Sequence, residues 1–341
     1  MQLIQLEKFT LIICTYMRPT ALLKLLRSVK EQSLYPNEII IVDGSTNTET
    51  KDVIESNSFN NLVYYRVKEE DRGLTKQRNF GINKLAADSS IVCFLDDDIV
   101  LTKNYFKELI NTYKVKPEAI AVGGYITNEI KWVEYRGESC PKGKYCIDGY
   151  QRNEPLKFKV RKILGLLPDT LPGMICSSSH GRSVSFLPPN GRIYEVEQFM
   201  GGVSSYKTEV FNKVGFSEYF EGYGLYEDLD FCIRLLPLGK LYVNTAAQLE
   251  HYHEASGRPN QFKYGKMVVK NGWYVWRLKN KRPSFKTKIK WYSVSLLQIT
   301  LRFMNVFNTS KRIEALSDAF GRIYAIIGLM INKPKLPNKR L

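Results

Sequence analysis

The first hundred residues alternate between short apolar runs and longer segments in which apolar residues recur at helical spacing. Buried β-strands are predicted from the apolar runs at residues 9–14, 38–42, 62–67 and 90–95. Helices are predicted between them, over residues 21–29 and about 75–87. Apolar strands that alternate with helices are typical of an α/β fold, in which a mostly parallel sheet is covered on both faces.

The rest of the chain is less regular. Another strand is predicted over residues 119–126, and helices are predicted over residues 208–214 and 227–236. Residues 131–198 are rich in Gly, Pro, Ser and Lys, follow no clear period, and exceed the length of an ordinary loop. We predict that this segment is an insertion covering one side of a binding site, within a domain formed by residues 1–258.

Polar residues follow three of the predicted strands at the point where each strand ends. These polar segments are residues 15–18, 43–46 and 96–98. In parallel α/β sheets, ligands bind beyond the carboxyl ends of the strands. We therefore predict that the three segments contribute to one binding site.

Three consecutive aspartates, Asp96, Asp97 and Asp98, come directly after the fourth predicted strand. Carboxylates this close repel one another unless a cation is bound. Mg²⁺ or Mn²⁺ would remove that repulsion, and the same ion would also bind phosphate oxygens. The alternative is an acidic turn that is simply solvated.

A second acidic group, Glu227, Asp228 and Asp230, lies at the start of a predicted apolar helix. Acidic residues at this position interact favourably with the helix dipole, which is one explanation for them. The other explanation is catalytic, because a carboxylate there can take a proton from a hydroxyl group.

Two of the three histidines, His251 and His253, lie two residues apart. In a strand, such residues share a face. Imidazole binds Mn²⁺-like ions together with carboxylates, so both histidines are candidate metal ligands. The alternative is a pair of packed or surface histidines.

The net charge of the chain is +16, and the excess of basic residues is greatest towards the C-terminus. No Asp or Glu occurs between Glu254 and Glu314, whereas the same stretch holds fourteen Lys or Arg residues. Such a charge attracts polyanions, which include anionic lipids, nucleic acids and phosphorylated substrates.

The six cysteines are too few and too scattered for a disulfide scaffold. Cys14 and Cys93 lie in apolar strands, where cysteine behaves as a small apolar residue. We therefore expect a reducing compartment. A zinc site formed by Cys140, Cys146 and Cys176 is disfavoured, because neither a C-x-x-C pattern nor a nearby histidine accompanies them.

In this order, the polar segments and their strands resemble those of the family 2 glycosyltransferases, over about residues 8–260. Residues 10–19 are similar to the family's first strand and nucleoside-binding loop. The donor-binding residues implied there are Thr15, Tyr16 and Arg18. Residues 38–46 are similar to the second strand, whose acid, here Asp43, contacts the base. The family often has two consecutive aspartates at this point, whereas Gly44 follows Asp43 in this chain.

Two further segments carry the resemblance on the donor side. A G-x-x-x-x-R-N-x-G segment is similar to one in the family, and its arginine, Arg78, would lie near the nucleotide. The aspartate turn matches the family's D-x-D motif, with Asp96 and Asp98 as the metal-binding acids. The resemblance also implies that Asp96 and Asp97 contact the donor.

Later segments resemble the acceptor side of the family and its metal site. The acceptor-side residues implied by the match are Gly201, Gly202 and Glu227. Asp228 corresponds to the catalytic base. Residues 253–258 resemble a histidine segment that completes the metal site in some members, which points to His253, with His251 as the alternative.

The resemblance implies a GT-A fold and transfer with inversion at the anomeric carbon. The donor would be a nucleoside diphosphate sugar, for which we expect UDP, and the acceptor a hydroxyl group of a glycan or a lipid-linked glycan. Mn²⁺ or Mg²⁺ would neutralise the charge that develops on the leaving diphosphate. Asp228 would take the acceptor proton, and residues 131–198 would determine acceptor selectivity.

Residues 259–341 are predicted to form a basic helical extension. Residues 289–307 form an amphipathic helical pattern, and a second apolar helix is predicted over residues 313–330. Such helices suit an anionic membrane surface. The alternative is packing on protein, including pairing in a homo-oligomer.

The first ten residues do not fit a signal peptide, and no uncharged apolar run reaches about eighteen residues. We therefore expect a cytoplasmic protein, peripheral at the inner face of the cell membrane, that acts in polysaccharide assembly of the cell envelope.

Two other functions fit parts of the pattern less well. A nucleotidyltransferase would also use acidic metal ligands, but its first loop is usually rich in glycine, and residues 15–19 contain none. Binding of nucleic acid through the basic C-terminal residues is consistent with the charge. No helix-turn-helix, RRM or zinc-finger pattern accompanies that charge, so we do not expect nucleic acid as a partner.

Overall fold

The computed structural model describes residues 7–178, 181–220, 222–253 and 259–337. The chain divides into two compact units. The first unit consists of residues 1–132 and 184–257, and the second of residues 133–183 and 258–341.

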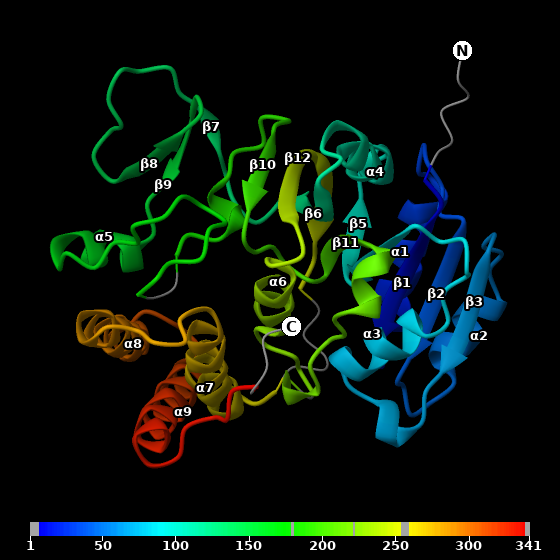
Figure 1. Ribbon diagram of the computed structural model, residues 1–341. Coiled ribbons are helices and arrows are strands. Elements are labelled where there is room, and N and C mark those ends of the chain that lie inside the picture. Colours follow the sequence, from blue (N-terminus) through cyan, green and yellow to red (C-terminus); the bar gives the residue numbers. More distant parts are fainter. Residues whose placement is uncertain (1–6, 179–180, 221, 254–258, 338–341) are drawn as a thin grey trace. The chain divides into compact units, whose positions relative to one another are not determined.

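The first unit is built on one large sheet (Figure 1). Among the described residues this sheet has nine strands, in the order β10-β12-β6-β11-β4-β1-β2-β3, and β5 pairs with β12. The strands are β1 (Phe9–Thr15), β2 (Glu38–Asp43), β3 (Leu62–Arg66), β4 (Ile91–Asp96), β5 (Ile99–Leu101), β6 (Ala119–Ile126), β10 (Ile193–Val196), β11 (Val203–Lys207) and β12 (Lys240–His251). Strands β5, β10 and β11 run antiparallel to their neighbours, and the other pairs are parallel.

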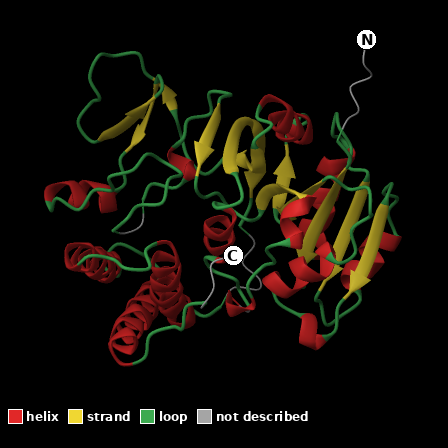
Figure 2. Cartoon of the chain, viewed as in Figure 1, coloured by secondary structure: helices red, strands yellow, loops and turns green. Residues whose placement is uncertain are grey.

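Helices flank the strands of this sheet (Figure 2), and an apolar layer covers each of its faces. In β1, Leu11 and Ile13 belong to one layer and Ile12 to the other, which explains why the strand is apolar throughout. Helices α1, α2 and α4 contribute to the first layer, and α3 and α6 to the second. These helices are α1 (Pro19–Lys30), α2 (Glu49–Glu55), α3 (Leu74–Ile82), α4 (Tyr105–Val115) and α6 (Glu227–Leu235). The predicted α/β fold with a covered sheet is confirmed.

Short 3₁₀ helices complete the first unit. They are η1 (Glu69–Asp71), η2 (Val184–Phe186), η3 (Thr208–Asn212) and η4 (Glu218–Phe220). The helix predicted over residues 208–214 is only η3, because Val210 is the one buried residue within it and little apolar contact supports a longer helix.

The second unit combines a small antiparallel sheet with four helices among the described residues. The sheet contains β7 (Val133–Glu134), β8 (Lys144–Ile147) and β9 (Tyr150–Asn153). The helices are α5 (Leu156–Ile163), α7 (Gln261–Lys279), α8 (Phe285–Asn305) and α9 (Arg312–Ile331). Helices α7, α8 and α9 share an apolar core that includes Trp273, Trp276 and Trp291. No helix among the described residues has the length and apolar character needed to cross a bilayer.

The segment predicted as one insertion, residues 131–198, is divided between the two units. Residues 133–183 group with the C-terminal helices, and α5 contacts α8. Residues 184–198 return to the first unit, where Ile193–Val196 forms β10 beside β12. The reason is that Val196 and Tyr194 pack into the apolar layer of the main sheet.

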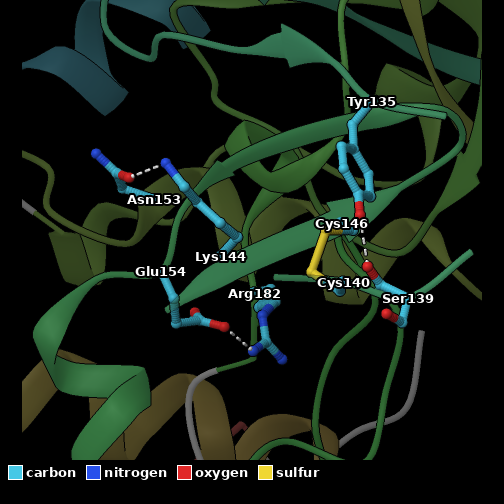
Figure 3. Close-up of a disulfide and its surroundings, with 8 residues drawn as sticks. All are labelled: Tyr135, Ser139, Cys140, Lys144, Cys146, Asn153, Glu154 and Arg182. Carbon is cyan, nitrogen blue, oxygen red and sulfur yellow. Dashed lines mark hydrogen bonds and ion pairs between the residues drawn. A yellow bond between two sulfur atoms is a disulfide. The ribbon is translucent and has the colours of Figure 1, made fainter. Parts of the chain in front are cut away.

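The expectation of reduced cysteines is wrong at one place, because Cys140 and Cys146 form a disulfide (Figure 3). Cys146 lies in β8, and Cys140 lies six positions earlier, before the strand begins. Sequence reasoning considered a scaffold of several bridges or a zinc site, and missed this single local link. Among the described residues, the free cysteines are Cys14, Cys93, Cys176 and Cys232.

Candidate active site

The predicted polar segments meet at the carboxyl ends of three neighbouring strands. In the parallel register, Thr15 at the end of β1 is opposite Asp43 at the end of β2. Asp96 ends β4 and is opposite Cys14. The strand pairing therefore brings the first loop and the aspartate turn together, as ligand sites of parallel α/β sheets require.

The three aspartates of the turn have different partners. Asp97 is buried and accepts hydrogen bonds from Oγ1 of Thr15 at 2.7 Å and from Nη1 of Arg18 at 2.9 Å. Burial raises the pKa of Asp97 to about 6, although Arg18 and Thr15 oppose that shift. Asp97 therefore ties the first loop to the aspartate turn and fixes Arg18.

Asp96 and Asp98 instead gather with His251. Each of the three side chains offers one ligand atom, and these atoms lie within 4.8 Å of one another. Nε2 of His251 is 3.2 Å from Oδ1 of Asp98. Burial would lower the pKa of His251, but hydrogen bonds to Asp98 and Glu129 raise it to about 10. Two carboxylates and one imidazole form a donor set that fits Mn²⁺ or Mg²⁺.

His253, the first candidate from sequence, lies in a different group of the described residues. Its Nε2 is 2.8 Å from Oε1 of Glu129, and it clusters with Glu129 and His251. His253 lies after the end of β12 with a positive φ of 51°, so it is not a strand residue, but its ring still lies beside that of His251, with 4.0 Å between the ring centroids. The rest of the resembled histidine segment, residues 254–258, lies outside the described residues.

Arg78 on α3 connects two acids of the site. The residue is 2% exposed, and its guanidinium pairs with Oε1 of Glu227 and lies 3.5 Å from Oδ1 of Asp96. It also lies over the rings of Phe94 and Phe216, at 5.6 and 5.2 Å from their centroids. Burial would lower the pKa of Arg78, but Glu227 and Asp96 raise it, so this arginine stays charged.

Two glycines before β11 allow these acids to approach the backbone. A β-carbon at Gly202 would lie 2.0 Å from Oδ2 of Asp96, and one at Gly201 would lie 2.5 Å from Oε1 of Glu227. The backbone N–H of Asp96 donates to the carbonyl of Gly202 at 3.0 Å. Neither position has room for a side chain, which is why this segment contains glycine twice.

The acidic group at the start of α6 is held by an unusual backbone. Tyr226, directly before the helix, has a left-handed φ of 73°, which only a constrained site maintains for a non-glycine residue. Burial raises the pKa of Glu227 to about 7, although Arg78 opposes that shift. Burial also raises the pKa of Asp228, against the backbone N–H of Leu229, which donates to Oδ1 at 2.7 Å.

Asp43 and the first loop form the part of the site that is predicted to contact the nucleoside. Asp43 is fully buried and accepts hydrogen bonds from the hydroxyl of Tyr64 at 2.7 Å and the backbone N–H of Ser45 at 2.8 Å. Tyr16 is exposed beside this turn. Sequence reasoning missed Gln77, whose amide donates to the carbonyls of Thr15 at 3.1 Å and Val42 at 2.8 Å. Gln77 therefore joins the ends of β1 and β2. In the sequence, the only indication of this role was that Gln77 lies in the same segment as Arg78.

Asn79 was also missed. Its Nδ2 donates to the carbonyl of Phe216 at 2.9 Å, and the backbone N–H of Phe216 donates back to its Oδ1 at 2.9 Å. This reciprocal pair fixes the segment whose ring lies against Arg78. It explains in physical terms why an asparagine follows the arginine in the motif.

Comparisons with known proteins match this arrangement. The family described as Glycosyl transferase family 2 matches residues 10–178, and the family described as N-terminal domain of galactosyltransferase matches residues 181–262. The two matches together span the strand ends, both glycines, the acidic helix and the histidines described above. The chain belongs to the family 2 glycosyltransferases.

Curated glycosyltransferases are similar to parts of this family 2 glycosyltransferase. Glucosyl-dolichyl phosphate glucuronosyltransferase of Haloferax volcanii is 30% identical over 147 residues, which cover 42% of this chain and 45% of that protein. O-antigen chain rhamnosyltransferase RfbN of Salmonella typhimurium is 27% identical over 117 residues, which cover 34% of this chain and 36% of that protein. This chain thus matches less than half of the length of each of these relatives.

A solved structure supports the fold of this glycosyltransferase. GalNAc-T7, in a crystal structure with UDP, GalNAc and Mn²⁺, aligns with a TM-score of 0.51 at 17% sequence identity. The alignment covers 78% of this chain and 48% of that one. The predicted GT-A fold is confirmed.

Proposed function

We propose that the protein transfers a sugar from a nucleoside diphosphate sugar, with UDP as the expected nucleotide, to a hydroxyl group of a glycan or lipid-linked acceptor, with inversion. One observation carries this proposal. A set of contacts runs from His251 and Asp98 through Asp96 and Arg78 to the start of α6. It joins a donor set that suits a divalent cation to buried Glu227, and the next residue, Asp228, is a half-buried carboxylate that suits a base.

The donor would bind over the ends of β1, β2 and β4. In this proposal Asp96, Asp98 and His251 hold Mn²⁺ or Mg²⁺, which stabilises charge on the leaving diphosphate. The donor is contacted by Thr15, Tyr16, Arg18, Asp43, Arg78, Asp96 and Asp97. Arg18 and Arg78 add positive charge beside the acids, and Asp97 keeps Arg18 directed at the site. The UDP and Mn²⁺ in the GalNAc-T7 structure support this use of the fold.

Asp228 would be the general base. It lies in the first turn of α6, directly after Glu227, whose pairing with Arg78 fixes the helix start. A carboxylate whose pKa is raised by burial takes a proton more readily at neutral pH than a solvated one. Asp228 then removes the proton of the acceptor hydroxyl while that oxygen attacks the anomeric carbon opposite the leaving group, which produces inversion.

The acceptor is proposed to be a glycan or a lipid-linked glycan. The name of the Haloferax volcanii relative describes a sugar attached to a lipid phosphate, which supports a lipid-linked acceptor here. Gly201, Gly202 and Glu227 would form its side of the site, and the segment 131–198 would contribute to selectivity. We also propose peripheral binding to an anionic membrane, as found at the cytoplasmic leaflet, because the basic second unit exposes Phe285, Phe307 and Ile313.

Replacement of the base tests the function directly. We expect Asp228→Asn to lower turnover by about two to four orders of magnitude, because the acceptor proton has no recipient. Binding of the nucleotide sugar should remain, because donor contacts are assigned elsewhere. Turnover is measured with a radiolabelled donor, and binding by calorimetry with Mn²⁺ and with EDTA.

The matched control is Asp88→Asn, a surface aspartate that pairs with Lys8. It should retain full turnover. Wild-type turnover in Asp228→Asn would remove Asp228 from the role of base, and nucleotide affinity that is equal with Mn²⁺ and EDTA would remove the metal from the proposal.

A further inference from the structure

One carboxylate beside the proposed metal site has no role in the function derived so far. Glu129 follows β6, and its Oε1 lies 3.0 Å from Nδ1 of His251 and 2.8 Å from Nε2 of His253. Its side chain is 28% exposed. Glu129 therefore contacts the ring edge of His251 that is turned away from Asp98, since Nε2 of His251 is the atom near Asp98.

The position of Glu129 is set by hydrogen bonds of the two preceding residues, and not by its own carboxylate. Nδ2 of Asn128 donates to the carbonyl of His251 at 3.0 Å, and the backbone N–H of His251 donates to Oδ1 of Asn128 at 3.0 Å. The backbone N–H of Thr127 donates to the carbonyl of Leu249 at 2.9 Å. These bonds join Thr127 and Asn128, the two residues before Glu129, to the end of β12, so a substitution of the Glu129 side chain leaves the framework intact.

The chemistry of imidazole gives this contact a consequence. A neutral histidine carries one ring proton, and only the nitrogen without it can bind a metal ion. A carboxylate that accepts the proton on Nδ1 leaves the lone pair on Nε2, fixes the ring orientation, and makes the ring a stronger ligand. In this chain Nε2 is the nitrogen that faces Asp98.

We propose that Glu129 is a positioning residue that holds His251 with Nε2 directed at Asp96 and Asp98, and so sets the affinity of this site for a divalent cation. The inference rests on the metal site of the proposed function. Glu129 is not itself a ligand of that ion, because the two groups of ligand atoms share only His251. Nε2 of His253 lies 2.8 Å from the same oxygen of Glu129.

The test compares three variants of the full-length protein. Glu129→Ala removes the acceptor for Nδ1–H, Glu129→Gln retains a weaker neutral acceptor, and Glu250→Gln is the matched control. Glu250 is adjacent to His251 on β12, but its carboxylate accepts from the hydroxyl of Tyr252 at 2.5 Å. Affinity for Mn²⁺ alone is measured by calorimetry, and the His251 tautomer by NMR of isotope-labelled histidine with Mg²⁺.

We expect the dissociation constant for Mn²⁺ to rise about 10–100-fold in Glu129→Ala, less in Glu129→Gln, and not at all in Glu250→Gln. The Nδ1–H signal of His251 should be present in the wild type with Mg²⁺ and lost or mixed with the other tautomer in Glu129→Ala. A purely structural role would change the melting temperature but not the tautomer.

The outcomes separate this inference from the function on which it rests. Wild-type Mn²⁺ affinity or an unchanged tautomer in Glu129→Ala would overturn the role of Glu129, while Asp98→Ala still lost Mn²⁺ binding. If Asp98→Ala bound Mn²⁺ as the wild type does, the metal site itself would fail, and the role of Glu129 would fail with it.

Discussion

Asp96 lies against the backbone of Gly202, where any side chain would displace its carboxylate. The same acid is 3.5 Å from Arg78, and it is one of the three groups that suit a divalent cation. A side chain added at Gly202 would therefore disturb both the contact between Asp96 and Arg78 and the group of metal ligands. This makes the glycine a sharper probe of the metal group than removal of one of its acids, because every charge is retained.

At this residue scale we predict that Gly202→Ala weakens metal-dependent donor binding. The added methyl group overpacks against Asp96, which costs about 1–3 kcal/mol, or about tenfold to hundredfold in affinity. Binding is measured by thermal shift and calorimetry with a panel of nucleotide sugars, in Mn²⁺ and in EDTA.

Gly215→Ala is the matched control for this change. A β-carbon at Gly215 would meet only Oδ1 of Asn79, at the ordinary contact distance of 3.5 Å. Its donor affinity should equal that of the wild type. Equal affinities in Gly202→Ala and Gly215→Ala would mean that Asp96 does not need its present position for donor binding.

Helices α7 and α9 illustrate what is decided at the scale of whole elements. The sequence predicts helices in this region from apolar spacing, and α8 and α9 lie close to the predicted ranges. Their packing depends on two glycines: a β-carbon at Gly321 would lie 2.2 Å from the carbonyl of Phe262, and one at Gly265 would lie 2.2 Å from that of Asp318. Part of the apolar surface predicted to face a membrane, including Trp291 and Ile299, is buried between these helices instead.

We predict that Gly321→Ala separates α7 from α9 and lowers the free energy of unfolding. Overpacking costs about 1–3 kcal/mol, and a cost in the upper part of this range is expected because the contacted atoms belong to the backbone. This cost exceeds the gain of about 1 kcal/mol from the better helix propensity of alanine. Urea unfolding monitored by tryptophan fluorescence is suitable, because Trp273, Trp276 and Trp291 lie in this core.

Gly328→Ala is the control on the same helix, since a β-carbon there meets no atom within 4 Å among the described residues. It should be neutral or stabilise the fold by up to about 1 kcal/mol. Similar unfolding curves for the two alanine variants would argue against close packing at Gly321.

At the scale of the whole molecule, charge and exposed apolar surface are unevenly distributed. Fourteen Lys or Arg residues lie between Glu254 and Glu314 without an intervening acid. Phe307 and Ile313, in the same part of the chain, are each 84% exposed. Basic and apolar groups that occur together suit the surface of an anionic bilayer.

We predict that the double variant Phe307→Ser, Ile313→Ser binds anionic vesicles at least about tenfold more weakly, because two large apolar side chains no longer enter the interface. Co-sedimentation with phosphatidylglycerol vesicles measures this, and binding should also weaken with added salt. Val63→Ser, at an exposed apolar residue of the first unit, is the control. Unchanged vesicle binding together with loss of a dimer in light scattering would favour subunit pairing through these helices.

The sequence by itself determined strands β1 to β4 and β6, the covered α/β sheet and the edge of the sheet where the site lies. It could do so because burial on both faces makes strands continuously apolar, and because parallel strands present their carboxyl ends at one edge. The aspartate turn and the acidic start of α6 were visible for the same reason, since local pattern and position along the chain are enough to recognise them.

Only the tertiary structure decided how the side chains of the site are oriented and paired. Arg78 and Glu227 are 149 residues apart in sequence, and no local pattern indicates that they form a buried pair. The structure also groups His251 rather than His253 with the aspartates, and directs Asp97 towards Arg18. Side-chain direction depends on packing between distant segments, which a local period of apolar residues does not contain.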